Sequence, residues 1–272
     1  MQAKPITFVT ATNDRAILES NFLASPCLAP GSPHQVLIQE GFPSASLAYN
    51  DAIDQSVNDL IVFAHQDILF GTRWVEDLRR ALDHLERTDP NWGVLGCYGE
   101  TLDDHGRGYI LSSAQGILGK PFEQPEPVQT LDEIVLILRK SSGMRFDENL
   151  PHFHFYGTDI CMEAAQRGQT AYAIPAFCVH NTSQQFALPA EFYDCYAYIR
   201  RKWAKRLPIQ TTVIRITQSD IPMYRRRVKE FYLRRLRRRT AGASRVADGK
   251  ALLWQHERAI AAQGVHEQAA PR

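Results

Sequence analysis

The segment DLIVFAHQDILF, residues 59–70, is the feature that most limits the folds open to this chain. Its apolar runs, 60–64 and 68–70, are continuous, which is typical of a strand buried on both faces in a sheet covered by helices. The polar triplet His65-Gln66-Asp67 interrupts them. A carboxylate between buried apolar residues is costly unless a cation or several hydrogen-bond donors contact it. We therefore expect Asp67 to have a specific partner.

Strand and helix patterns alternate on both sides of this segment. Strands are expected at residues 6–13, 34–41, 92–99, 128–140 and 170–183. Helices are expected at residues 44–56, 71–88 and 156–168, of which the second has apolar residues at amphipathic spacing. This alternation predicts an α/β fold with a Rossmann-like, mostly parallel sheet flanked by helices.

Composition predicts one principal domain with an appendage. The 272 residues are 44% hydrophobic, enough for one large core. The net charge of +1 hides an asymmetry, because residues 200–239 hold fifteen Lys or Arg but only two acidic residues. We expect a main domain over residues 1–185, a basic and aromatic helical extension over 186–240, and a loosely ordered tail over 241–272.

The chain has the cysteine pattern of a cytoplasmic protein. Its five cysteines are scattered without a CxxC pair, which favours reduced thiols over disulfides or a cysteine-based zinc site. The first apolar run is too short for a signal peptide, and no window reaches the roughly 18 to 20 apolar residues of a membrane span. Any membrane contact is expected to be peripheral.

Polar residues collect where the expected strands end. They are Thr10, Thr12, Asn13, Glu40, His65, Asp67 and His180. In open α/β sheets ligands bind outside the carboxyl ends of the strands, so this distribution predicts a binding crevice. The alternative is that strand ends merely tolerate polar residues.

A divalent cation is one partner that would offset the cost of burying the Asp67 carboxylate. Mg²⁺ and Mn²⁺ take oxygen ligands and are often held by one or two protein groups plus substrate phosphates. His65, two residues away on a strand, would point to the same side as Asp67. His180 would add a second imidazole, which suits Mn²⁺ better than Mg²⁺.

A second candidate cluster lies in MRFDENLPHFHFYGTDICMEA, residues 144–164. Asp159 falls in the first turn of the expected helix, where the helix dipole favours a negative charge. Aromatic and histidine residues directly before it are suited to a pocket wall that stacks on a sugar ring. The alternative is that Asp159 is an ordinary helix-start carboxylate.

The order of these segments resembles family 2-like, nucleotide-sugar-dependent glycosyltransferases of the A-type (GT-A) fold. The resemblance covers roughly residues 5–183. The matching segments, in order, are FVTATN, SASLAYNDAI, DLIVFAHQDI, RFDENLPHFHFYGTDICMEAAQRG and IPAFCVHN.

The resemblance implies a role for each candidate residue. Thr10, Thr12 and Asn13 would line the nucleotide pocket, Glu40 would lie near the base or ribose, and Asn50 would hold the helix and loop around the nucleotide. His65-Gln66-Asp67 occupies the place of the family's Asp-x-Asp signature, with Asp67 as metal ligand, His180 as an additional ligand and Asp159 as catalytic base. Two departures are His65 in place of the first carboxylate and Thr158 where many relatives have Glu.

The predicted function is a metal-dependent, inverting glycosyltransferase. It would use Mn²⁺ or Mg²⁺ and move a sugar from a nucleotide-diphosphate sugar to a hydroxyl of a glycan or lipid-linked acceptor. The resemblance implies uridine as the base, and therefore a UDP-sugar as donor. One alternative is a non-catalytic nucleotide-sugar-binding scaffold. Another is a metal-dependent hydrolase that uses His65, Asp67, His154, Asp159 and His180.

The basic and aromatic region, residues 198–239, has three interpretations. A helix there packs its apolar side on the main domain, with Tyr224, Val228, Phe231, Tyr232 and Leu236 on that side. Alternatively, the region binds an anionic membrane at the inner face, as suits an enzyme of polysaccharide biosynthesis with a lipid-linked acceptor. Nucleic-acid binding is the third interpretation and has no accompanying module.

Overall fold

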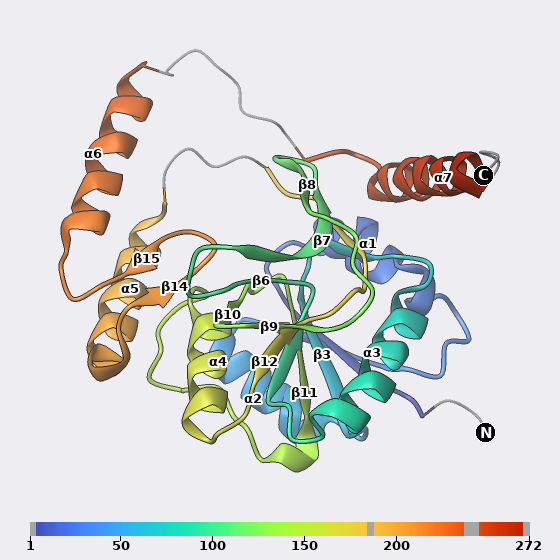
Figure 1. The fold of residues 1–272 in the computed structure, drawn as a ribbon, viewed down its shortest axis with the longest axis horizontal. Helices are drawn as coiled ribbons and strands as arrows, with labels where there is room; N and C mark the ends of the chain where they lie inside the picture. Colours follow the sequence, from blue (N-terminus) through green and yellow to red (C-terminus); the bar gives the residue numbers. More distant parts are fainter. Residues whose placement is uncertain (1–3, 184–187, 237–244, 269–272) are drawn as a thin grey trace.

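The computed structural model describes residues 4–183, 188–236 and 245–268 (Figure 1). A seven-stranded sheet forms its centre, in the order β2-β1-β3-β11-β5-β12-β9. The strands are β2 (Gln35–Glu40), β1 (Thr7–Thr12), β3 (Leu60–His65), β11 (Val135–Arg139), β5 (Val94–Gly96), β12 (Ala171–Ala173) and β9 (Glu126–Val128). Only β11 and β9 run against the others, which confirms the mostly parallel sheet.

Successive residues of the central strands point to opposite faces, and both faces are buried. In β3, Ile61 and Phe63 join one apolar cluster while Val62 and Ala64 join the other. Because a strand covered on two sides needs apolar residues at every position, the continuous run at 60–64 is explained.

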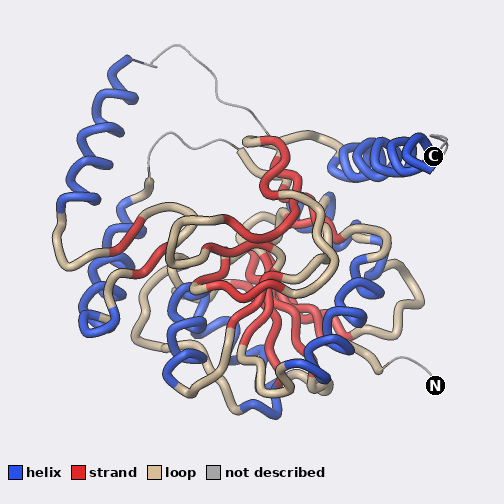
Figure 2. The backbone as a smooth tube through the Cα atoms, viewed as in Figure 1, coloured by secondary structure: helices blue, strands red, loops and turns tan. Residues whose placement is uncertain are grey.

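Helices cover the two faces (Figures 1 and 2). On one face lie α2 (Ala45–Gln55), α4 (Tyr156–Gln166) and α5 (Ala190–Lys202), and on the other α1 (Arg15–Ser20) and α3 (Trp74–Thr88). Short 3-10 turns span Phe22–Ala24, Pro26–Leu28, Lys140–Ser142 and Ala204–Arg206. The expected layering of helix, sheet and helix is confirmed.

A second sheet lies against the carboxyl end of the first. Its order is β10 (Thr130–Leu131), β6 (Tyr98–Glu100), β7 (Gly106–Ser112), β13 (Cys178–His180) and β4 (Ile68–Phe70), with β8 (Gly116–Gly119) paired to β7. Four stretches expected as single strands, 59–70, 92–99, 128–140 and 170–183, each divide between the two sheets. In 92–99 the chain changes sheet at Cys97, and in the other three it does so at polar residues or at Pro175, where the ladder cannot continue.

The extension after residue 185 is continuous with the main core. Phe192, Tyr196 and Trp203 of α5 and its end belong to the same apolar cluster as α2 and α4. A two-stranded sheet follows, β14 (Ile209–Gln210) with β15 (Arg215–Ile216), and then α6 (Ile221–Leu236). The boundary expected at residues 185 and 186 therefore does not separate two cores.

The tail expected to be loosely ordered instead contains α7 (Gly249–Gln268). Leu253 of α7 is fully buried against Leu69 and Val179, because its apolar side chain covers the edge formed by β4 and β13. Residues 241–244 and 269–272 lie outside the described residues. Within the described residues, no helix is both long enough and apolar enough to cross a bilayer.

Candidate functional site

Polar residues interrupt the apolar run because the chain turns there, between β3 and β4. His65 ends β3, Gln66 and Asp67 form the turn, and Ile68 begins β4 in the second sheet. Asp67 therefore lies in a turn at the carboxyl end of the central sheet, not within a strand as expected. Its side chain is only 8% exposed.

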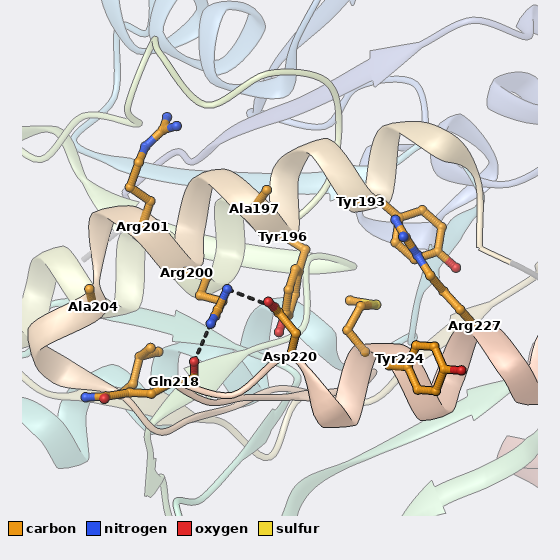
Figure 3. A pocket seen from close by; sticks show the side chains of 12 residues that line it. Tyr193, Tyr196, Ala197, Arg200, Arg201, Ala204, Gln218, Asp220, Tyr224 and Arg227 are labelled. Carbon is orange, nitrogen blue, oxygen red and sulfur yellow. Dashed lines mark hydrogen bonds and ion pairs between the residues drawn. The ribbon is translucent and has the colours of Figure 1, made fainter.

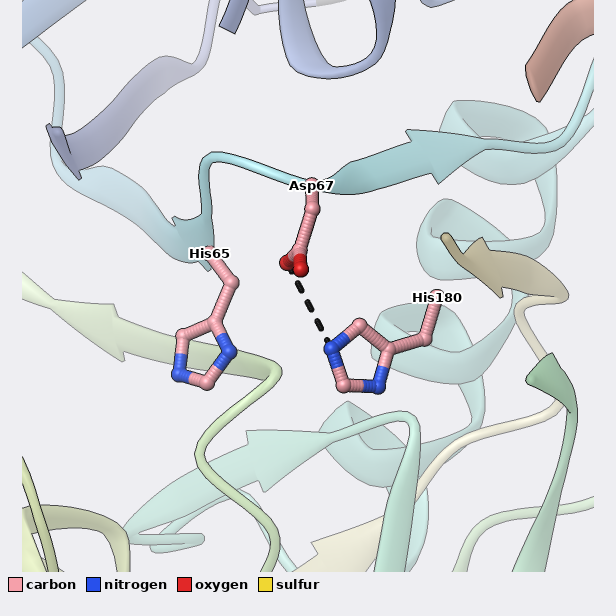
Figure 4. A group of neighbouring side chains, drawn as sticks. All are labelled: His65, Asp67 and His180. Atoms are coloured by element: carbon pink, nitrogen blue, oxygen red, sulfur yellow. Dashed lines mark ion pairs between the residues drawn. The ribbon is translucent and has the colours of Figure 1, made fainter. Parts of the chain in front are cut away.

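His65, Asp67 and His180 come together at this turn (Figure 4). One potential ligand atom from each lies within 4.8 Å of the others, and His180 Nε2 is 3.4 Å from Asp67 Oδ1. Pairing of β13 with β4 brings His180 opposite Ile68 and so beside Asp67. The structure thus brings the two predicted metal ligands, Asp67 and His180, together with His65.

The surroundings of Asp67 keep its carboxylate ionised. Burial by itself would raise the pKa of Asp67, but a hydrogen bond and charge from His180, with His65 and Arg245, hold it well below its usual value. Burial lowers the pKa of His65, which keeps that imidazole neutral near pH 7. An ionised Asp67 and a neutral His65 are protonation states that metal binding requires.

The donor set fits a divalent transition metal. Two imidazoles and one carboxylate suit Mn²⁺ better than Mg²⁺, which prefers oxygen ligands. His65 Nε2 lies 2.9 Å from Tyr156 Oη, which donates to the carbonyl oxygen of Glu133. Because that phenol hydrogen is used, His65 is expected to donate from Nε2, leaving Nδ1 free as a ligand atom.

A pocket of about 390 Å³ adjoins the cluster. Its walls are Ala11, Thr12, Asn13, Gln39, Gly41, Phe42, Tyr49, His65, Gln66, Asp67, Phe153 and Tyr156. They come from the ends of β1, β2 and β3, from α2, and from the loop before and first turn of α4. The pocket combines aromatic walls with a few polar groups, as small-ligand sites usually do.

Gln66 organises the polar side of this pocket. Its side-chain oxygen accepts hydrogen bonds from Thr12 Oγ1 and from the backbone N–H groups of Asn13 and Asp14. Its amide nitrogen donates to Asn13 Oδ1 at 2.7 Å. Thr12 and Asn13, both predicted for the nucleotide pocket, are therefore held in place by the middle residue of the polar triplet.

Three other predicted nucleotide residues lie outside the pocket lining. Thr10 is fully buried, and Glu40 is exposed at the end of β2, 3.9 Å from Arg15. Alternation along β2 directs Gln39 rather than Glu40 to the pocket. Asn50 is buried and bonds the backbone N–H and carbonyl of Phe146, joining α2 to the loop that precedes α4.

Asp159 is held in a buried ionic cluster. It is 2% exposed, and its two oxygens accept hydrogen bonds from Lys202 Nζ at 2.9 Å and Trp203 Nε1 at 2.7 Å. Lys202 also contacts Asp147 and Glu163. Burial raises the pKa of Asp159, although Lys202 and Trp203 oppose the shift. Its role as catalytic base stays a prediction.

The five ligands of the hydrolase alternative do not converge. Among the described residues, only His65, Asp67 and His180 form a group able to hold a metal ion. His154 instead packs edge-on against Phe192, and burial, followed by the charge of His65, lowers its pKa to about 4.

Sequence reasoning missed Arg245. Its guanidinium donates to Asp67 Oδ2 at 2.9 Å from 178 positions further along the chain. No local pattern around Arg245 distinguishes it from the many basic residues that precede it in the extension.

A larger cavity, of about 770 Å³, lies between α5 and α6 (Figure 3). It is lined by tyrosines and arginines, including Tyr193, Tyr196 and Tyr224. Arg200 at its edge is paired with Asp220 at 2.8 Å, while the buried Tyr196 hydroxyl has no hydrogen-bond partner among the described residues.

Four residues of α6 that were expected to pack on the main domain are exposed. The exposed fractions are 68% for Tyr224, 37% for Val228, 60% for Phe231 and 58% for Tyr232. The side chain of Leu236 lies outside the described part of the structure. The packed-helix interpretation is therefore wrong for these four residues.

Comparison with known proteins gives a match over most of the chain. A protein-family model described as "Glycosyltransferase like family" matches residues 8–196. The protein "ATP synthase subunits region ORF 6" of Fuscovulum blasticum is 30% identical over 132 residues, which are 47% of this chain and 53% of that protein. The match spans about half the length of this curated relative.

Solved structures give more distant matches. GalNAc-T7 with UDP, GalNAc and Mn²⁺ is 10% identical with a TM-score of 0.48, covering 85% of this chain and 55% of that one. S. aureus TarS 1–349 in complex with UDP-GlcNAc is 12% identical with a TM-score of 0.46, covering 73% and 66%.

Proposed function

Because the chain belongs to the glycosyltransferase-like family, we propose that it transfers a sugar from a nucleotide-diphosphate sugar to an acceptor hydroxyl, assisted by a divalent cation. The His65–Asp67–His180 cluster beside the pocket is the observation that carries this proposal. Its place at the carboxyl ends of β1 and β3 is where α/β sheets of this kind bind nucleotides.

The pocket residues have distinct roles in this proposal. Gln66 fixes the loop of Thr12 and Asn13 that would contact the nucleotide, and Phe42 and Phe153 contribute apolar walls that limit water. Tyr156 orients His65. A bound cation would neutralise charge on the leaving diphosphate.

We propose that the reaction inverts the anomeric configuration. The acceptor oxygen forms a bond to the anomeric carbon as the bond to the diphosphate oxygen breaks, and a general base takes the hydroxyl proton. Asp159 remains the base proposed from the family resemblance, although it would first have to leave Lys202 and Trp203. The family resemblance also makes UDP-sugars the first donors to test.

We propose a lipid-linked or glycan acceptor reached at an anionic membrane surface. Exposed Tyr224, Phe231 and Tyr232 alternate with arginines along α6, which stands at the periphery beyond α5 (Figure 1). Aromatic side chains enter the headgroup region, and each nearby basic residue adds about 1 kcal/mol of attraction. This arrangement supports a peripheral protein at the inner face of the membrane in polysaccharide biosynthesis.

The first experiment is donor hydrolysis with purified protein. UDP-, GDP- and dTDP-sugars are tested with Mn²⁺, Mg²⁺ or EDTA, and nucleotide release is measured. We expect Mn²⁺-dependent release that falls at least about 100-fold in Asp67→Asn, because the only carboxylate of the cluster is lost. Asp83→Asn, which alters an exposed aspartate of α3, is the matched control and should retain activity.

A non-catalytic nucleotide-sugar-binding protein is the second candidate. It is favoured by the pairing of Asp67 with Arg245 and by the engagement of both Asp159 oxygens. Tight nucleotide binding without release from any donor, with or without metal and acceptors, would favour this candidate over the enzyme.

A further inference from the structure

Arg245 contacts the metal cluster from the far end of the chain. Its guanidinium donates to Asp67 Oδ2 at 2.9 Å through one nitrogen and to the carbonyl oxygen of Asn181 at 2.7 Å through Nε. Asn181 directly follows His180 in sequence. Arg245 therefore contacts both strand ends that supply the cluster.

Hydrogen bonds on either side of the Arg245 side chain fix its position. The backbone N–H of Arg245 donates to Ser183 Oγ at 3.2 Å. Val246 exchanges two bonds with the Asn181 side chain, each at 2.8 Å, and Asn181 is fully buried. Because Asn181 also bonds Asn21 at 2.8 Å, this contact belongs to a buried polar network.

Packing of α7 adds a second anchor. A Cβ placed on Gly249 would meet Leu69 at 2.3 Å and Asn21 at 2.7 Å, so the helix start lies directly on β4. Further along α7, Leu253 is buried, and Glu257 accepts hydrogen bonds from the backbone and hydroxyl of Thr72 at 2.8 Å. Among the described residues, Arg245 is thus the first of a docked segment.

The two oxygens of Asp67 serve different partners. Oδ1 faces His180 at 3.4 Å, and Oδ2 faces Arg245 at 2.9 Å. A cation bound by the two imidazoles would use Oδ1, while the guanidinium retains Oδ2. We propose that Arg245 is a second positive charge of the donor site, which shares Asp67 with the divalent ion and binds the donor's diphosphate.

The chemistry of a diphosphate supports this assignment, which rests on the proposed function. A nucleotide diphosphate carries more negative charge than one carboxylate-bound divalent ion neutralises. A guanidinium presents several N–H donors in a planar fork that suits phosphate oxygens. In the donor-free protein the same guanidinium neutralises Asp67, and it therefore opposes binding of a metal ion alone.

The charge of Arg245 should therefore affect the affinities for Mn²⁺ alone and for UDP in opposite directions. Removing Arg245 should strengthen Mn²⁺ binding, because a repelling charge is lost, and should weaken UDP binding, because an attracting charge is lost. A purely structural role would weaken both. The proposal is therefore tested by measuring the two affinities separately.

The experiment uses the full chain with Mn²⁺ alone and then UDP at saturating Mn²⁺. Electron paramagnetic resonance measures free Mn²⁺, and calorimetry measures UDP binding. In Arg245→Ala we expect Mn²⁺ to bind about 3- to 10-fold more tightly and UDP about 10-fold more weakly. Arg245→Lys, which keeps the charge but not the fork, should lie between Arg245→Ala and wild type. Arg258→Ala, an exposed arginine of α7, is the matched control.

Loss of both affinities in Arg245→Ala, or values equal to those of Arg258→Ala, would overturn the inference while leaving the proposed function intact. Failure of the wild type to bind either Mn²⁺ or UDP would overturn the proposed function and this inference with it. Thermal unfolding of each variant shows whether Arg245→Ala is folded, and Arg245→Lys provides the test if it is not.

Discussion

Asp67 and Asp159 are both buried aspartates, but their partners differ in kind. Asp67 faces two histidines and an arginine beside a pocket, whereas Asp159 is enclosed by Lys202 and Trp203. A buried carboxylate needs partners in either case, so the sequence alone does not separate a ligand from a structural residue. The neighbours that distinguish the two aspartates come from distant segments of the chain.

Asp159→Asn tests whether this aspartate is structural. We expect the free energy of unfolding to fall by about 1–3 kcal/mol, because Lys202 loses one partner but keeps Asp147 and Glu163. Urea denaturation measures the change, with Asp83→Asn as the exposed control. Unchanged stability with donor turnover reduced 100-fold or more would instead identify Asp159 as the base.

Residues next to the apolar runs were the predictable part of the site. Asp67 and His180 stand out because polar side chains interrupt or end continuous apolar strands. Gln66 bonds to Asn13 and Tyr156 bonds to His65, and no periodic pattern in the sequence predicts these contacts. Glu40 was displaced from the pocket by one position, because neighbouring strand residues face opposite ways.

At the scale of elements, strand and helix existence was predictable and strand continuity was not. The runs at 59–70, 92–99, 128–140 and 170–183 have the length of one strand each, but each crosses from one sheet to the other. A turn of two polar residues suffices for this change when both flanking segments are buried. The position of α7 was missed because its apolar contacts with Leu69 and Val179 are long-range.

The exposed face of α6 gives a prediction at this scale. Phe231→Ser combined with Tyr232→Ser should lower binding to vesicles containing anionic phospholipid at least about tenfold, since two interfacial aromatics are lost. Cosedimentation measures binding, and added salt should weaken the remaining electrostatic part. The melting temperature should not change, because both side chains are exposed.

Val57→Ser is the control for this experiment. Val57 is a more exposed apolar residue, at 79%, and lies outside α6. Equal vesicle binding by the double variant and the wild type would contradict a membrane role for α6. It would leave the cavity between α5 and α6 as a site for a smaller ligand.

At the scale of the whole molecule, the packing of α7 supports the segment that brings Arg245 to Asp67. Leu253→Ala should weaken the docking of α7 by about 2–5 kcal/mol, since a fully buried leucine leaves a cavity between Leu69 and Val179. Hydrogen exchange in residues 249–260 measures this loss. Ile260→Ala, on the same helix but 41% exposed, is the control. Unchanged exchange in Leu253→Ala would show that α7 does not depend on this contact.

The family and the layered architecture follow from short-range patterns, while the completed site depends on contacts across the chain. Alternating apolar runs and amphipathic helices were sufficient to predict the α/β fold with its mostly parallel sheet. The family was expected from the resemblance of five segments in order, and the family match over residues 8–196 confirms it. The contact of Arg245 with Asp67 lies outside that range and depends on the docking of the segment that follows.

The distance of Arg245 from Asp67 along the chain also has a consequence for biosynthesis. Ribosomes add residues from the N-terminus, and at roughly 5–20 residues per second the 178 positions between these two take about 10 to 40 seconds. During that interval a growing chain carries Asp67 without its guanidinium. His180, the third member of the cluster, is made 113 positions after Asp67, so the growing chain holds the whole cluster without Arg245 only over the last 65 positions.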